Sequence, residues 1–380
     1  MLSSLFPKHG LYDAPQIYAV TLAASGALLL TIFRLRRHIL HGAASLHLVG
    51  IPVFDSRDDD NGIVATLERA HKLHPDTPFA LAVPGQQLIV LPVSEIDTVK
   101  ALPENQVSIK KHHYNQFLGE HSYMGTKADE FDDAMRNLLV RNTPTVLRAF
   151  VAEIDYATRM TISSGELTDW TKVAPKAAMA RMATILSGRS FVGLPLSRDE
   201  EWIDATVGYT GDVSRAWMKL RFIPHLLRPL VAPFLAEVRS LEARKALIAR
   251  KLGNLLNQRE QNAHGRGGKP SVHRDDEDDV GGELLDWFRA QYTTHKPSVR
   301  ELTRDQLLAT FASIYNLTNA LTYILFDLAA YPDFVEELRA ELRDVLGDEG
   351  TIDKTSIMQL RKLDSFVRES QRLRPTSLGK

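Results

Sequence analysis

Two charged residues near the C-terminus have a spacing that brings them together on a helix. Glu369 and Arg372 lie in a segment that we predict to be helical from about Asp364 to just before Pro375. Residues at positions i and i+3 project from the same face of a helix, so these two side chains can form an ion pair. Such pairs occur on very many helices, and this one is informative only through its surroundings.

Other clusters of acidic residues are better explained as solvent-exposed segments than as metal sites. Residues 275–279 are all acidic, but they lie within the glycine-rich and charged segment 262–282, which we interpret as a disordered surface loop. Residues 58–60 resemble the start of a calcium loop. However, Gly62 at the sixth loop position would put Arg57 at the first ligand position, which a cation site cannot use.

The composition excludes several classes of function. The 380 residues contain no cysteine, which rules out disulfides, zinc–thiolate sites, iron–sulfur clusters and cysteine nucleophiles among them. Lys and Arg number 46 and Asp and Glu number 47, so the net charge is −1. A nucleic-acid-binding protein would normally have a basic excess, and we therefore expect no nucleic-acid partner.

An uncharged segment near the N-terminus predicts a membrane anchor. Residues 17–33 contain no charged side chain and are followed by Arg34, Arg36 and Arg37. As a helix this segment would reach about 25 Å, which is at the short end of a membrane span. Positive charge after the apolar segment predicts that the C-terminal side is cytoplasmic. We expect residues 1–40 to form a signal anchor; a buried core helix is the alternative.

The remaining chain predicts a mainly α fold with a small sheet near its N-terminal end. Gly50 and Pro52 favour a linker over residues 38–54, and a helix carrying Ile63 and Leu67 follows. Segments 79–83 and 88–91 have the composition of two strands joined by a turn. From about Ser94 onward helical periodicity dominates, interrupted near residues 191–195.

The C-terminal third contains the longest predicted helix. Thr303 and Gln306 have the spacing of a capping box, and the helix that they would begin runs to about Ala330. Apolar residues cover most of its predicted surface, which is typical of a helix buried in a large core. A second amphipathic helix follows Pro332 and ends at Gly347.

In this order, the C-terminal segments resemble those of one known family. The long helix, the turn Leu328-Ala-Ala-Tyr-Pro332, the next helix and then Phe366-Val-Arg-Glu-Ser-Gln-Arg-Leu-Arg-Pro375 resemble the central helix and the Glu-x-x-Arg helix of cytochrome P450. Residues 191–200 and 284–287 resemble the fungal members that oxidise terpenoids and other secondary metabolites. The resemblance covers essentially the whole chain.

This resemblance implies a fold, an activity and a set of partners. It implies a P450-like α+β domain over residues 41–380, a haem cofactor and an NADPH–cytochrome P450 reductase as redox partner. The implied activity is monooxygenation of a small apolar metabolite. The implied location is the endoplasmic reticulum membrane, with a single span and a cytoplasmic body. The sequence does not indicate which metabolite is oxidised, because ordinary apolar side chains line such pockets.

The chain departs from the family at the oxygen-activating segment of the central helix. Alignment from Pro332 puts that motif on residues 312–317, beginning Ala312, Ser313. Tyr315 then stands where relatives have an acid, and Asn316 where they have an alcohol, so the family's proton relay is degenerate here. The alternative is that these residues only pack in a core. Thr318 lies about 200° further around the helix and does not replace the alcohol.

The second departure concerns the haem ligand. The family binds haem iron through a cysteine thiolate beyond the Glu-x-x-Arg helix, and these 380 residues include no cysteine. His112 and His113 could contact haem, although an exposed basic turn explains them better. We therefore expect a P450 that is truncated at its C-terminus and inactive as given. The alternatives are a degenerate remnant and a membrane-anchored helical scaffold or binding protein without cofactor.

Overall fold

The computed structural model describes residues 50–57, 62–83, 86–162, 172–223, 227–265, 281–347, 350 and 352–375. The predicted anchor at 17–33, the acidic turn at 58–60 and residues 266–280 of the predicted loop lie outside these ranges. Within the described ranges, no helix combines the length and the apolarity needed to cross a bilayer. The chain divides into two compact units, one formed by residues up to Ser108 with Met218–Ala232 and one by the rest.

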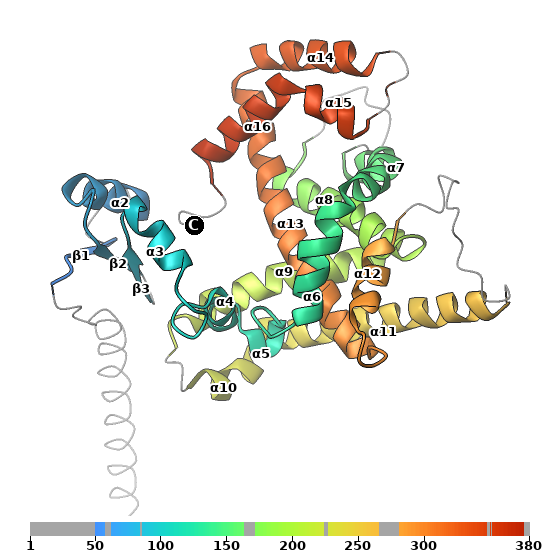
Figure 1. The fold of residues 1–380 in the computed structure, drawn as a ribbon, viewed down its shortest axis with the longest axis horizontal. Helices are drawn as coiled ribbons and strands as arrows, with labels where there is room; N and C mark the ends of the chain where they lie inside the picture. The colour runs from blue at the N-terminus through green and yellow to red at the C-terminus, as the bar shows by residue number, and fades with distance from the viewer. Residues whose placement is uncertain are drawn as a thin grey trace, which may run out of the picture. The chain divides into compact units, whose positions relative to one another are not determined.

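The first unit contains the small sheet. Its strands are β1 (Val53–Asp55), β2 (Phe79–Val83) and β3 (Gln86–Val90), in the order β1-β2-β3. β1 pairs with β2 in parallel, and β2 pairs with β3 in the antiparallel direction. Helix α2 (Gly62–Leu73) contacts β1 and β2, and Figure 1 shows it beside them. The unit also contains α3 (Ile96–Lys100) and α10 (Arg228–Val231).

The second unit is built from helices. In chain order these are α4 (Ile109–Gln116), α5 (Gly119–Ser122), α6 (Asp129–Asp133), α7 (Thr143–Thr161), α8 (Pro175–Phe191), α9 (Glu200–Leu220, whose last three residues belong to the first unit), α11 (Ala236–Gly265), α12 (Glu283–Gln291), α13 (Val299–Ala330), α14 (Asp333–Leu346), α15 (Lys354–Gln359) and α16 (Arg361–Leu373). Figure 1 shows α14 and α16 at the C-terminal end of α13.

Packing of α8 against α13 forms the centre of the second unit. α8 also packs against α7, and these two contacts are the most extensive between helices of the described chain. Eleven residues of α8 are buried, including Ile185, Leu186 and Phe191. The main hydrophobic core joins residues of α8, α9, α11, α12 and the first half of α13.

Several predicted boundaries are confirmed and several are wrong. The strand at 79–83, the helix with Ile63 and Leu67 and the helix ending before Gly347 are confirmed. Residues 53–55 are not linker but strand β1, because Ala80 N–H donates to the carbonyl of Pro52 (2.8 Å) and the strand then continues beside β2. α11 continues to Gly265, so the first residues of the predicted loop are helical.

The start of α13 also differs from the prediction. The capping box is formed by Ser298 and Glu301: the Ser298 side chain accepts a hydrogen bond from Glu301 N–H, and the Glu301 side chain accepts one from Ser298 N–H. Thr303 lies inside the helix, where its hydroxyl donates to the carbonyl of Val299 (2.6 Å). The true box lies five residues upstream of the predicted one and satisfies the first N–H groups of the helix.

The expectation that α13 is buried all round is wrong for its second half. Leu302 to Phe311 are all buried except Arg304, which is partly buried. From Ala312 onward, buried and exposed positions alternate with the period of a helix, so one side of the second half faces solvent. The exposed side includes large apolar residues, namely Tyr315, Tyr323, Leu325 and Phe326.

We expect the charge of Glu301 to stabilise the fold at neutral pH and not under acidic conditions. Hydrogen bonds from the backbone and side chain of Ser298 lower the pKa of Glu301 from 4.5 to about 2. A carboxyl whose pKa is lower in the folded chain stabilises it above pH 4.5, and this contribution is lost as the pH falls toward 2. Glu301→Gln should therefore lower the free energy of unfolding by roughly 0.5 kcal/mol at neutral pH, the size of one charge at a helix N-terminus.

Urea unfolding followed by circular dichroism tests this expectation. The difference between Glu301→Gln and the parent chain should be larger above pH 4.5 than below it, and it should shrink as the pH falls toward 2. Ser298→Ala removes the hydroxyl partner and serves as the matched variant. A difference that does not change with pH would show that the carboxylate charge of Glu301 contributes nothing.

Candidate functional site

Three of the four residues assigned to the oxygen-activating segment lie on the exposed side of α13. Ala312, Tyr315 and Asn316 are exposed, and positions i, i+3 and i+4 share one face of a helix. The amide of Asn316 donates to the carbonyl of Ala312 (2.8 Å), so the side chain lies along the helix surface. The alternative that these three residues pack in a core is therefore wrong for the described chain.

Ser313, the fourth assigned residue, lies on a different side of the helix. Its hydroxyl is 2.6 Å from the hydroxyl of Ser187 on α8. Ser187 is only 2% exposed. This hydrogen bond joins α8 and α13 through two serines that are 126 positions apart in sequence. Ser313 thus links this part of α13 to α8, whereas Ala312, Tyr315 and Asn316 face outward.

Aromatic rings form a wall beside the exposed side of α13. The rings of Phe311 and Tyr315 are stacked, with centroids 6.0 Å apart and planes 5° from parallel. Phe117, just after α4, meets Phe311 edge to face at 5.3 Å, and Trp217 lies 6.3 Å from Phe117. Tyr315 remains 42% exposed, so its ring is available to a ligand. Phe117 and Trp217 cannot be identified from the sequence pattern, because neither lies near Tyr315 in the chain.

Thr318 does not compensate for the missing alcohol. It is buried, unlike Ala312, Tyr315 and Asn316. Its carbonyl accepts a hydrogen bond from the hydroxyl of Thr322 (2.6 Å), while its own hydroxyl has no hydrogen-bond partner among the described residues. Thr318 is thus turned away from the exposed side, as its angular position predicts.

Glu369 and Arg372 form the predicted ion pair, but on the protein surface. The guanidinium of Arg372 donates two hydrogen bonds of 2.7 Å to the carboxylate of Glu369. The Glu369 and Arg372 side chains are 55% and 67% exposed. The hydrogen bond from Arg372 lowers the pKa of Glu369. Because water solvates both groups, this ion pair contributes little to the free energy of unfolding.

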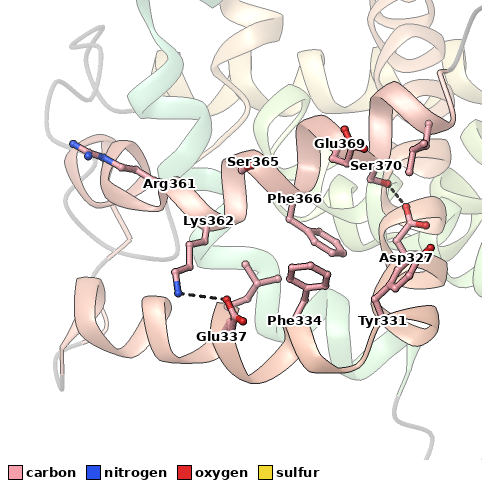
Figure 2. Close-up of a pocket in the computed structure, with 12 residues that line it drawn as sticks. Asp327, Tyr331, Phe334, Glu337, Arg361, Lys362, Ser365, Phe366, Glu369 and Ser370 are labelled. Carbon is pink, nitrogen blue, oxygen red and sulfur yellow. Dashed lines mark hydrogen bonds and ion pairs between the residues drawn. The ribbon is translucent and has the colours of Figure 1, made fainter.

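A cavity of about 560 Å³ lies between the helices that follow α13. α14 and α16 form its walls, and the last turns of α13 close one end. Figure 2 shows Phe334 and Phe366 facing each other inside it, with ring centroids 5.6 Å apart. Glu369 and Ser370 lie at the end of the cavity near Asp327 (Figure 2).

The donor atoms of this chain do not match the haem ligation of the family that the sequence resembles. None of the 380 residues is a cysteine, and the described residues contain no cluster of three or more His, Asp or Glu side chains able to hold a metal ion. His112 and His113 are exposed residues of α4. Desolvation and the neighbouring His112 lower the pKa of His113, and its ring contacts Phe117 at 5.7 Å. We therefore derive no catalytic step through haem.

Comparison with known proteins shows a long match to one family. A model of the family described as "Cytochrome P450" matches residues 140–379. The chain is 59% identical to "Cytochrome P450 monooxygenase gliF" of Aspergillus fumigatus over 365 residues, which are 95% of this chain and 70% of that protein. It is 50% identical to "Cytochrome P450 monooxygenase ataF" of Aspergillus terreus over 94% of this chain and 68% of that protein.

The fold agrees with the sequence match. The structure of a retinoic acid-bound cyanobacterial CYP120A1 superimposes on the chain with a TM-score of 0.54 and 17% identity. That match covers 85% of this chain and 69% of the other. The expected family, fold and haem cofactor of that family are therefore confirmed. This chain belongs to the cytochrome P450 family and is similar to the monooxygenases of fungal secondary metabolism.

Proposed function

We propose that this chain supplies the central-helix scaffold and the substrate-facing surface of a fungal monooxygenase that oxidises an apolar secondary metabolite, terpenoid or similar. The observation that carries this proposal is the exposed side of α13 at Ala312, Tyr315 and Asn316, with an aromatic wall beside it. Exposed apolar surface of this kind is typical of a binding site.

The residues of this surface suggest how a substrate would be held. The exposed ring of Tyr315, which stacks on the buried ring of Phe311, offers a flat apolar surface, and Ala312 leaves room next to it. The Tyr315 phenol and the Asn316 amide are the polar groups on this side, and they can hydrogen-bond a substrate oxygen. Burial of apolar substrate area against the rings would supply most of the binding free energy.

Haem, as the family's cofactor, supplies oxygen activation when it is bound. The residues of this chain orient and enclose the substrate, and Ser313 holds the segment in place through Ser187. Neither Tyr315 nor Asn316 is an acid, so proton delivery by the family's acid–alcohol pair has no equivalent at these positions. We propose that a polypeptide of these 380 residues is inactive by itself as a haem–thiolate enzyme.

The spectrum of the reduced carbon monoxide complex tests this point. Thiolate ligation shifts the absorption to a wavelength that histidine or water ligation does not reach. The 380-residue chain reconstituted with haem should give no thiolate-type spectrum and no turnover with NADPH–cytochrome P450 reductase, the redox partner that the family implies. A thiolate-type spectrum, or product formation by this polypeptide, would overturn the proposal. A cofactor-free scaffold would instead bind no haem at all.

A substitution in the aromatic wall tests the substrate surface. Tyr315→Asp puts a charge where apolar surface is proposed to be buried, and we expect the affinity for terpenoids to fall about tenfold. Equilibrium dialysis against a panel of terpenoids and their polar glycosides measures this affinity. Met358→Asp, at a residue of α15 that is also exposed, is the matched control and should have no effect. Equal loss of affinity in both variants would contradict a site at α13.

We further propose that residues 17–33 anchor the chain in the endoplasmic reticulum membrane by a single span with a cytoplasmic body. The uncharged segment followed by three arginines supports this proposal. The expressed chain should stay in the membrane fraction during alkaline carbonate extraction, and deletion of residues 1–40 should release it. Complete extraction of the intact chain without detergent would refute the anchor.

A further inference from the structure

Helix α16 is held at its N-terminus by a carboxylate of α14. Glu341 accepts hydrogen bonds from the backbone N–H groups of Lys362 (2.7 Å) and Leu363 (2.9 Å). These are among the first N–H groups of α16, which have no partner within the helix itself. A negative charge at this end also matches the helix dipole. Glu341 thus acts as a cap supplied by another helix.

The C-terminal end of α16 is held by a second carboxylate, from α13. Asp327 is only 4% exposed and accepts a hydrogen bond from the Ser370 hydroxyl (2.6 Å). It also forms an ion pair with Arg374, the residue that follows α16. The guanidinium of Arg374 lies over the ring of Tyr323, at 5.9 Å from its centroid. Asp327 and Tyr323 are four residues apart, so one face of α13 provides both contacts.

Between its two ends, α16 makes few contacts with α13 and α14. The cavity of about 560 Å³ lies along the inner side of α16, and Figure 2 shows that the Phe334–Phe366 contact spans it. Because much of this side faces a cavity and not packed side chains, close packing alone does not determine where α16 lies. The two carboxylate contacts therefore have a large share in its placement.

The position of Asp327 in α13 is unfavourable for the helix alone. An acidic side chain in the last turn opposes the negative end of the helix dipole, and α13 has no basic residue in that turn. A buried carboxylate without a partner would lower the free energy of unfolding by roughly several kcal/mol. The contacts with Ser370 and Arg374 offset both the unfavourable helix dipole and the desolvation of the carboxylate. An acidic side chain at position 327 is therefore explained by these two partners.

We propose that Asp327 is a positioning residue that fixes α16, and with it the exposed Glu369–Arg372 pair, relative to the exposed side of α13. Ser370 lies between the two residues of that pair in sequence and Arg374 follows them, so α16 binds Asp327 while the side chains of Glu369 and Arg372 remain exposed. Asp327 lies eleven positions after Asn316, or about 16 Å along the same continuous helix. A change at Asp327 therefore alters the spatial relation between the two regions.

The absence of cysteine from the 380 residues allows a direct measurement of this position. Cysteines introduced at Arg300 on α13 and Arg368 on α16, both exposed, can carry spin labels. Double electron–electron resonance then reports the distance distribution between the helices in the full chain. We expect Asp327→Asn to shift or broaden this distribution. The amides at the C-terminal end of α16 should also exchange about tenfold faster, as expected for loss of a charge-assisted hydrogen bond.

Matched variants separate positioning from general destabilisation. Arg374→Gln removes the ion pair at a partly exposed residue and should broaden the distribution even if Asp327→Asn fails to fold. Arg374→Lys keeps the charge and should restore the parent distribution. Glu369→Gln breaks only the outward pair and should leave the distance unchanged. An unchanged distribution in Arg374→Gln, or the same broadening in Glu369→Gln, would overturn the proposal.

Discussion

The packing of α8 along α13 is the contact on which the rest of the helical unit depends. α13 is long enough to contact α8, α11, α12 and α16 in turn, and α8 joins it to α7. Packing against α8, with the hydrogen bond between Ser187 and Ser313, fixes the rotation of α13 about its own axis. That rotation decides which residues face outward. The exposure of Ala312, Tyr315 and Asn316 therefore follows from packing on the opposite side.

Buried charged groups make one arrangement of these packed helices more favourable than others. Glu153 on α7 is fully buried and accepts two hydrogen bonds from Arg198, of 2.7 and 2.9 Å. Asp305 on α13 pairs with Arg304 and accepts a hydrogen bond from Tyr292, and desolvation raises its pKa. A buried charge without its partner is costly, so such groups favour the one arrangement of helices that pairs them. Asp327 belongs to the same class at the other end of α13.

The family match covers the helical scaffold of this chain, whereas the thiolate that binds haem iron in the family has no equivalent among its 380 residues. The match to fungal monooxygenases covers the scaffold, the central helix and the Glu369–Arg372 helix. The chain spans 70% of the length of its Aspergillus fumigatus relative, and its 380 residues include no thiolate donor. The features that it does contain are the helical scaffold, the exposed side of α13 that we propose to face the substrate, and the contacts that hold α16.

Local patterns in the sequence were enough to predict the helical class, strand 79–83, the C-terminal ends of α13 and α14 and the Glu369–Arg372 pair, because each depends on residues close together in the chain. Strand β1 and the burial of α13 could not be predicted in this way. Val53–Asp55 is a strand only because β2 lies beside it, and hydrophobic periodicity does not reveal which side of α13 another helix covers. The Phe117–Phe311 contact and the Asp327–Arg374 pair join residues 194 and 47 positions apart in sequence, which only the tertiary fold brings together. The exposure of Glu369 likewise depends on which side of α16 the other helices cover.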